Sequence, residues 1–293
     1  FFQVFSTLGP IYGVQAHTAF TEWFKIFNVF KLSFAKLLFI PGECFGPMWV
    51  RLLISALWPY AAIPIIIFGV SFIHMCRKRS IRAIATLFEN VTSLFIYVFT
   101  VVFYLALPSV SSNIFDAIKC QSFQNDDENL KQSYLIADLE QECDGSFDVI
   151  FWILFLMWPV LMPFVFFCLL WKVKGSVRTR RITTLANSCR FLWQDYNENM
   201  VFWEIFDISR KIILTGIVIF IDKEEGSSRI LRLVVAITLS TLYFGLLSLA
   251  RPFKETHDLY LAFTCHFLLI CCFALGIICL LYTSDAADEI VRV

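Results

Sequence analysis

Apolar residues in this chain gather in long runs separated by polar connectors. Six runs approach or exceed the roughly 20 apolar residues that a helix needs to cross a bilayer. They cover residues 48–76, 84–107, 148–171, 206–222, 230–250 and 258–282. The fourth is the weakest, because Arg210 and Lys211 stand in its first turns. The pattern predicts an all-α fold, a polytopic transmembrane helix bundle with about six spans.

A different periodicity precedes the first span. In segment 17–42, one stripe of apolar residues repeats at three-and-four spacing, and polar residues gather on the opposite face. The stripe consists of Trp23, Ile26, Phe27, Phe30, Phe34, Leu37 and Leu38. This spacing predicts an amphipathic helix that lies in the membrane interface.

The two ends of the chain carry separate expectations. Segment 1–16 is apolar from its first residue and is interpreted as the end of a truncated helix, so a longer protein is expected. The letters LLYTSDAADE at 280–289 resemble translated sequencing-adapter read-through. Segment 283–293 is therefore expected to be a non-native tail without function. Between these ends, 43–282 is expected to form one membrane domain.

Charges in the connectors predict an orientation. Connectors 77–83 and 172–190 are basic, whereas loop 109–147 holds eight acidic residues against two lysines. Basic connectors stay on the cytoplasmic side of membranes. We therefore expect a multi-pass protein of the plasma membrane, with loop 109–147 extracellular and the two basic connectors cytoplasmic.

Composition agrees with lipid as the main partner. Hydrophobic residues make up 58% of the 293 residues and charged ones only 16%, more apolar surface than a water-soluble domain can hide. The net charge is zero, so nucleic acid is not an expected partner. The sequence contains no phosphate-binding loop, nucleophile elbow or zinc-protease motif, so we expect neither an enzyme nor a cofactor.

Cysteines suggest one crosslink. Cys120 and Cys143 flank the acidic loop, where an oxidising compartment favours a disulfide. Such a bond would stabilise the loop by roughly 3–4 kcal/mol. Pairing of Cys44 with either of them is the alternative. Since no histidine accompanies them, no metal site is expected. Cys189, at the inner face, is interpreted as an unmodified thiol, with palmitoylation as the alternative.

Ionisable residues near the fourth run form the densest candidate site. Glu204, Asp207, Arg210 and Lys211 lie within eight positions of one another. Asp207 stands three residues before Arg210 and four before Lys211, spacings at which helical side chains meet. One interpretation is a gating switch whose ion pairs exchange partners. The other is a structural anchor that fixes the depth of the helix.

Other polar residues within spans give weaker candidates. Glu89, Asn90 and His266 are candidates for an ion or proton pathway, or alternatively an interfacial carboxylate and a hydrogen-bonded core histidine. The exposed candidates are Arg178, Arg180 and Arg181, which either bind anionic lipid headgroups or only set topology. Candidate partners are thus the bilayer, cations, anionic headgroups and further copies of the chain.

Several segments together resemble a known family. They are PGEC at 41–44, LPSVSSNIFDAIKC at 107–120, SYLIADLEQEC at 133–143, YNENMVFWEIFDISRKIILTG at 196–216 and LARPFKETHDLYLAF at 249–263. In this order they resemble the membrane regions of protist and algal surface proteins with EGF-like or ephrin-receptor-like repeats. Those regions are called TRP-like carboxy-terminal domains, by similarity to polycystin-like and fungal TRP-like channels. The resemblance implies a cation channel or sensory domain; a receptor anchor and a transporter are the alternatives.

Overall fold

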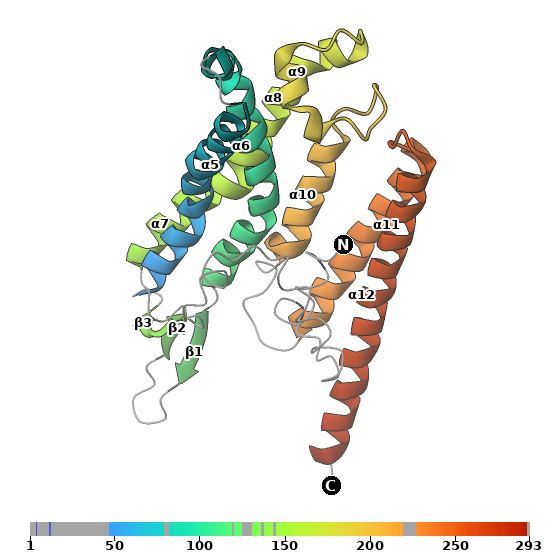
Figure 1. Ribbon diagram of the computed structural model, residues 1–293. Coiled ribbons are helices and arrows are strands. Elements are labelled where there is room, and N and C mark those ends of the chain that lie inside the picture. The colour runs from blue at the N-terminus through green and yellow to red at the C-terminus, as the bar shows by residue number, and fades with distance from the viewer. Residues whose placement is uncertain are drawn as a thin grey trace. The chain divides into compact units, whose positions relative to one another are not determined.

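The computed structural model describes residues 4, 12, 47–78, 82–118, 120–124, 131–135, 138–142, 145–218 and 227–291 (Figure 1). Its helices are α5 (Met48–Lys78), α6 (Arg82–Ala117), α7 (Gly145–Phe155), α8 (Met162–Arg178), α9 (Thr184–Ser188), α10 (Trp203–Thr215), α11 (Ser227–Ala250) and α12 (Thr256–Val291). Two short helical turns, η3 (Leu156–Leu161) and η4 (Arg190–Leu192), complete the helical part. The amphipathic helix predicted at 17–42 and almost all of segment 1–16 lie outside the described residues.

The chain divides into two compact units, and each is described by itself. Residues Leu32–Phe206 form one, named here the aromatic unit after the side chains in its core. Residues Phe1–Lys31 and Asp207–Val293 form the other, named the charged unit after the ion pairs on α10. Helix α10 contributes its first four residues to the aromatic unit and the remainder to the charged unit.

Five helices in the described part of the chain are long and apolar enough to cross a membrane. The segments are Met48–Ile73, Thr92–Ala117, Val149–Arg178, Ile230–Ala250 and Thr256–Tyr282. They correspond to five of the six predicted runs. The shortest has 21 residues, which at 1.5 Å per residue reach about 30 Å, the thickness of the hydrocarbon core.

The sixth predicted span, at 206–222, is not among these five. It overlaps α10, whose 13 residues reach only roughly 20 Å. Residues 219–226 lie outside the described part of the chain. The total of six spans therefore stays a prediction.

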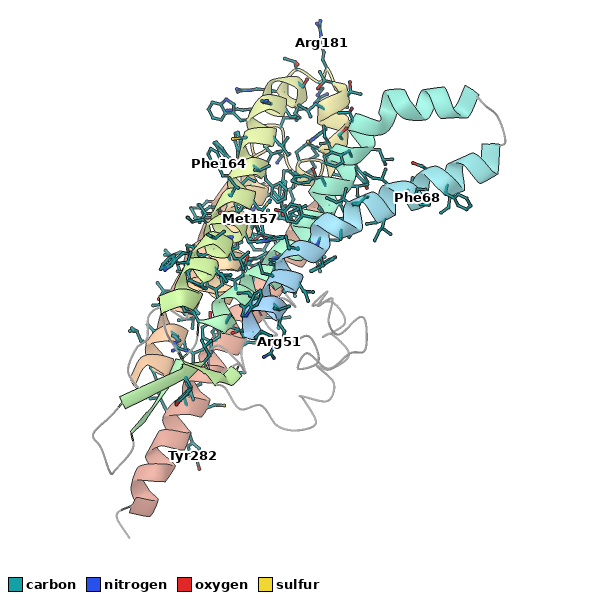
Figure 2. The ribbon with its side chains drawn as sticks, turned by 90° about the vertical axis from the view of Figure 1, so that its left-hand side faces the viewer. Arg51, Phe68, Met157, Phe164, Arg181 and Tyr282 are labelled. Carbon is teal, nitrogen blue, oxygen red and sulfur yellow. The ribbon has the colours of Figure 1, made fainter. Side chains whose placement is uncertain are left out.

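Large apolar side chains cover the outside of the five helices. Leu249 is 85% exposed, Phe68 73% and Ile65 71%. Figure 2 shows Phe68 on α5 and Phe164 on α8 projecting away from the ribbon. Surfaces of this kind are costly in water and favourable in lipid. The exposure pattern therefore supports the membrane assignment independently of run length.

Exposed hydroxyl groups on α11 and α12 are satisfied within their own helices. Thr238, Thr241 and Thr264 each donate to the carbonyl four residues earlier, at 2.7, 2.8 and 2.9 Å. Lipid offers no hydrogen-bond partner, so a polar group facing it must find one in its own backbone. These three bonds are the arrangement that a lipid-facing helix requires.

Helix α6 is longer than the sequence predicts. Its run was expected to end at residue 107, but the helix passes through Pro108 and ends at Ala117. The polar stretch stays helical because neighbouring helices supply partners. Asn113 donates to the Ser55 hydroxyl of α5 at 2.8 Å, and the Phe115 ring meets Phe155 of α7 edge-on. The predicted loop 109–147 is thus helical as far as residue 117.

A small sheet corrects the all-α prediction. Strands β1 (Cys120–Gln124), β2 (Lys131–Leu135) and β3 (Asp138–Glu142) pair antiparallel in that order, so the loop at 109–147 contains a meander. Short hairpins satisfy backbone groups locally without needing a long apolar run, which is why the hydrophobic pattern missed them. The remaining described elements are helical.

The sheet bears on the predicted disulfide. Strand β2 lies between β1 and β3, so the outer strands are about 10 Å apart, which exceeds the usual Cα separation of about 4.4–6.8 Å in a disulfide. Cys143 and Cys44 lie outside the described residues, so the disulfide stays a prediction, as does its alternative.

Stacked rings form the core of the aromatic unit. Phe103 of α6 and Trp158 of η3 are fully buried and stacked, with centroids 5.2 Å apart. Tyr60 of α5 meets Phe103 edge-on at 4.8 Å. Trp158 lies in a π-helical turn that also contains Pro159. A π turn absorbs the missing proline N–H and re-aims the following helix, so the rings can meet despite the proline.

Candidate functional site

The densest polar group in the charged unit lies on one face of α10. Asp207 accepts from Arg210 at 2.9 Å through Oδ1 and from Lys211 Nζ at 2.7 Å through Oδ2. The three side chains are only 14%, 8% and 15% exposed. The predicted i, i+3 and i, i+4 pairings are therefore both made, by the two oxygens of one carboxylate. We call Asp207, Arg210 and Lys211 the Asp207 cluster.

Two rings from other helices meet this cluster. The guanidinium of Arg210 lies over the ring of Tyr243 of α11, 4.2 Å from its centroid. The far ring in the stack is His266 of α12, whose imidazole lies 4.8 Å from Tyr243 at an interplanar angle of 23°. A cation held over an aromatic face is attracted to its quadrupole. Arg210, Tyr243 and His266 thus join the three helices of the charged unit in one stack.

His266 is anchored at one nitrogen only. Its Nδ1 lies 2.7 Å from the carbonyl of Ala262, so Nδ1 carries the proton and donates it. The other nitrogen, Nε2, is buried and has no hydrogen-bond partner among the described residues. The same holds for Nη1 of Arg210. The site therefore retains one unused acceptor and one unused donor.

Both oxygens of the Asp207 carboxylate are already engaged by cations of the same helix. A further cation entering this site would compete with Arg210 and Lys211 for those oxygens, and charges that are shielded from water interact strongly. The arrangement is therefore suited to holding helices in position, or releasing them, rather than to binding a permeating cation.

A residue far upstream closes the end of α10. The Tyr12 hydroxyl donates to the carbonyl of Leu214 at 2.8 Å, and its ring meets Phe273 of α12 edge-on. The last four carbonyls of a helix lack partners within the helix. Tyr12 supplies one, and with no exposed surface it also ties α10 to α12. Both contacts lie inside the charged unit.

Glu204, the fourth predicted member, belongs to the aromatic unit. It is 7% exposed, and the Tyr196 hydroxyl donates to its Oε2 at 2.5 Å. Its position in the first turn of α10 also places a negative charge at the helix end that favours one. We therefore assign Glu204 to the start of α10 rather than to the Asp207 cluster.

The predicted pathway residues are only partly placed. Glu89 and Asn90 lie on α6, but their side chains are outside the described part of the chain. His266 lies against Tyr243 and Ala262, as a hydrogen-bonded core histidine would. These contacts do not separate the two interpretations of His266. A core histidine would make them, and a pathway histidine would also have a ring nitrogen, here Nε2, without a partner.

The predicted headgroup arginines are all exposed. Arg180 is engaged with Glu198 at 2.7 Å on the surface, where its side chain is 84% exposed. Arg178 ends α8, and Arg181 is exposed beyond it. Surface pairs of this kind contribute about 0–1 kcal/mol. Binding of lipid by these three residues stays a prediction.

Cys189 is packed between helices. Its side chain has no exposed surface, and burial raises the pKa of the thiol from 9.0 to about 11, with a smaller opposite effect of Thr100. A thiol that is neither ionised nor accessible is a poor acceptor for an acyl chain. The interpretation of Cys189 as an unmodified thiol fits this environment better than palmitoylation.

Sequence reasoning missed Tyr243 and Tyr12. Tyr243 lies in an apolar run where one more aromatic carries no signal, and 33 positions separate it from Arg210. Tyr12 is 202 positions from Leu214. The charges on α10 gave no signal of these contacts either, because Glu204 and Asp207 balance Arg210 and Lys211 in number.

No family model, curated protein or solved structure matches this chain. What defines the class of protein is therefore the set of five apolar helices with lipid-facing exteriors. The chain is a multi-pass integral membrane protein.

Proposed function

We propose that this chain is a TRP-like cation channel or sensory membrane domain, and that the Asp207 cluster is its gating switch. The observation that carries the proposal is the joining of a shared carboxylate, two cations and two rings across α10, α11 and α12. Burying three ionised groups stabilises a fold poorly when compared with apolar packing. Their presence favours a role in which partners are exchanged.

The switch has two parts with different strengths. Asp207 pairs with both cations within α10, so these two ion pairs do not depend on the neighbouring helices. The contact between Arg210 and Tyr243 lies between helices, and it is the part that a movement of α10 would break. Cation–π contacts contribute up to about 2 kcal/mol when shielded from water. That is enough to change a closed-to-open ratio by roughly 30-fold.

Current measurement on the reconstituted protein tests the proposal. We expect cation current under stretch, voltage or lipid stimuli, and a change of roughly 10-fold in open-to-closed ratio for Tyr243→Leu. Tyr243→Phe keeps the aromatic face and should behave as the unchanged protein. The absence of current under all three stimuli would favour the membrane anchor of a surface receptor instead, provided that a thermal unfolding transition shows the protein to be folded.

The orientation is part of the same proposal. Basic connectors on the cytoplasmic side place the β1–β3 sheet outside the cell. Cysteines introduced at Ser122 of β1 and at Asp195, after η4, provide the test in intact cells. A membrane-impermeant thiol reagent should label Ser122→Cys only from outside and Asp195→Cys only after permeabilisation. Labelling of both from one side would contradict the arrangement.

A further inference from the structure

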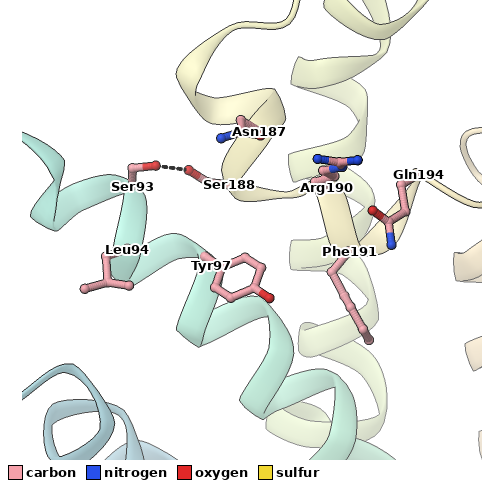
Figure 3. A pocket seen from close by; sticks show the side chains of 8 residues that line it. All are labelled: Ser93, Leu94, Tyr97, Asn187, Ser188, Arg190, Phe191 and Gln194. Atoms are coloured by element: carbon pink, nitrogen blue, oxygen red, sulfur yellow. Dashed lines mark hydrogen bonds between the residues drawn. The ribbon is translucent and has the colours of Figure 1, made fainter. Parts of the chain in front are cut away.

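A pocket opens inside the aromatic unit between α6 and the α9–η4 segment. Its volume is about 590 Å³. Figure 3 shows Ser93, Leu94 and Tyr97 on the α6 side, and Asn187, Arg190 and Gln194 on the other. No carboxylate is among the described side chains that line it. The pocket thus offers donors and one cation without a neutralising acid.

The pocket is held open by contacts on its rim. Ser93 and Ser188 share a hydrogen bond of 2.5 Å that joins α6 to α9 (Figure 3). Trp193 donates to the carbonyl of Ala186 at 3.0 Å, which fixes η4 against α9. Thr183 caps α9 by accepting from the Ala186 N–H. The α9–η4 wall is therefore ordered by its own hydrogen bonds rather than by a ligand.

Arg190 is the cation of the pocket. It is exposed, and it has no ion pair with any side chain that the structure describes. Arg180, by contrast, is engaged with Glu198. A guanidinium presents a planar fork of donors that suits phosphate oxygens. Asn187 and Gln194 add amide groups on the same wall.

The apolar wall and the depth of the pocket point to a lipid. Leu94 and Phe191 line it beside the polar groups, as a glycerol backbone with acyl chains requires. The Ser176 hydroxyl of α8 bonds to Thr183, so α9 lies at the end of α8 that carries Lys174 and Arg178. Cations at the end of a span mark the level of the headgroups.

We propose that this pocket binds the phosphate of an anionic phospholipid, with Arg190 as its main contact. The shared chemistry is a phosphate group on an apolar body. Its source is the surrounding bilayer, because Leu94 and Phe191 add apolar surface beside the polar groups and the pocket lies near the cationic end of α8. This site belongs to the aromatic unit, whereas the Asp207 cluster belongs to the charged unit, so either proposal can fail without the other.

Native mass spectrometry of the full chain tests the site. The protein is purified from nanodiscs of phosphatidylcholine, with or without phosphatidic acid, and is then delipidated in detergent. The mass of the remaining complex identifies the lipid that the protein retains. We expect one phosphatidic acid to be retained in preference to phosphatidylcholine. Arg190→Gln should weaken its retention by roughly 5- to 30-fold, whereas Arg190→Lys, which keeps the charge but loses the planar fork of donors, should weaken it by less.

Lys172→Gln is the matched control. It removes the same charge from the same connector, at an exposed position outside the pocket. If it weakens retention as much as Arg190→Gln, binding is diffuse and the proposed site is wrong. Because Arg190 is exposed, we expect its variants to unfold at the unchanged temperature in lipid-free detergent, which separates binding from folding.

Competition with soluble phosphates distinguishes the source. Glycerol 3-phosphate carries the headgroup phosphate without acyl chains. If the pocket binds a lipid, millimolar glycerol 3-phosphate should leave retention unchanged. Equal binding of glycerol 3-phosphate in the absence of lipid would overturn the lipid assignment and leave a site for a soluble phosphate.

Discussion

The two units differ in the chemistry of their buried side chains. The aromatic unit fills its centre with uncharged rings, of which Phe103 and Trp158 have no exposed surface. The charged unit places Asp207, Arg210 and Lys211 where only 8–15% of each side chain is exposed. Ring packing depends on shape and volume, whereas ion pairing depends on the presence of every partner.

This difference predicts how each unit responds to a change that preserves shape. In the aromatic unit, another apolar side chain of similar volume should be tolerated. In the charged unit, even an isosteric change that removes one charge takes a close ion pair away from its buried partners. The charged unit can therefore be disturbed by small chemical changes, which is the property required of a switch and a disadvantage in a scaffold.

The largest expected effect follows from Asp207→Asn. The amide has the same shape as the carboxylate but removes the negative charge that Arg210 and Lys211 share. We expect a loss of about 3–5 kcal/mol in the free energy of unfolding, measured by denaturation in bicelles. Asp195→Asn, at an exposed position after η4, is the control and should change stability by less than about 0.5 kcal/mol. An equally small loss in the free energy of unfolding for Asp207→Asn and Asp195→Asn would show that water reaches the Asp207 cluster.

The second prediction concerns the coupling between Asp207 and Lys211. Removing both charges, with Asp207→Asn and Lys211→Gln together, leaves only Arg210 unpaired over Tyr243. The double variant should therefore lose less than the sum of the single variants, with a coupling energy of about 1–3 kcal/mol. The same unfolding measurement on the four proteins of the cycle gives this value. Additive losses would mean that the 2.7 Å pair contributes nothing.

The two units also differ in how much of their structure could be predicted from the sequence. Run length predicted six spans, and five of them match helices that are long and apolar enough to cross a membrane, because a helix in lipid needs a continuous apolar stretch. It placed the end of α6 too early, since Ser and Asn after Pro108 resemble a loop until Asn113 is seen bonded to Ser55. The segment 206–222 was the weakest of the six predicted spans, because Arg210 and Lys211 shorten its apolar run.

The candidate site was predictable only within one helix. The spacing of Asp207, Arg210 and Lys211 is local, so the helical period reveals their pairing. The stack with Tyr243 and His266 depends on how three helices pack, and no periodicity in any one of them encodes it. The sheet at 120–142 was missed for a related reason, because strand pairing is a relation between segments.

The third prediction tests the aromatic unit with a change that keeps an apolar side chain. Phe103→Leu removes the stack on Trp158 but leaves an apolar side chain of comparable size. We expect a loss of about 1–1.5 kcal/mol, clearly less than for Asp207→Asn. Phe68→Leu, on the lipid-facing side of α5, is the control with an expected change near zero. A loss for Phe103→Leu as large as that for Asp207→Asn would remove the distinction between the units.

The smallest expected effect is the absence of a reaction at Cys189. A pKa near 11 leaves about one thiol in a thousand ionised at pH 8, and no part of the side chain is exposed. Peptide mapping after maleimide treatment at pH 8 should find Cys189 unlabelled in folded protein and labelled after denaturation. Asp195→Cys, in the same connector, should label in both states.

The same thiol gives a dependence of stability on pH with a definite sign. Between pH 9 and 11 the unfolded chain releases the Cys189 proton while the folded protein keeps it, so the unfolded state binds fewer protons and stability falls as pH rises. Cys189→Ala should flatten this slope, and below about pH 8 the variant and the original protein should share one pH profile. The aromatic unit thus keeps its buried titratable thiol neutral, whereas the charged unit pairs its buried groups. A thiol that labels readily at pH 8 in the folded protein would show that the aromatic unit is open to water at α9.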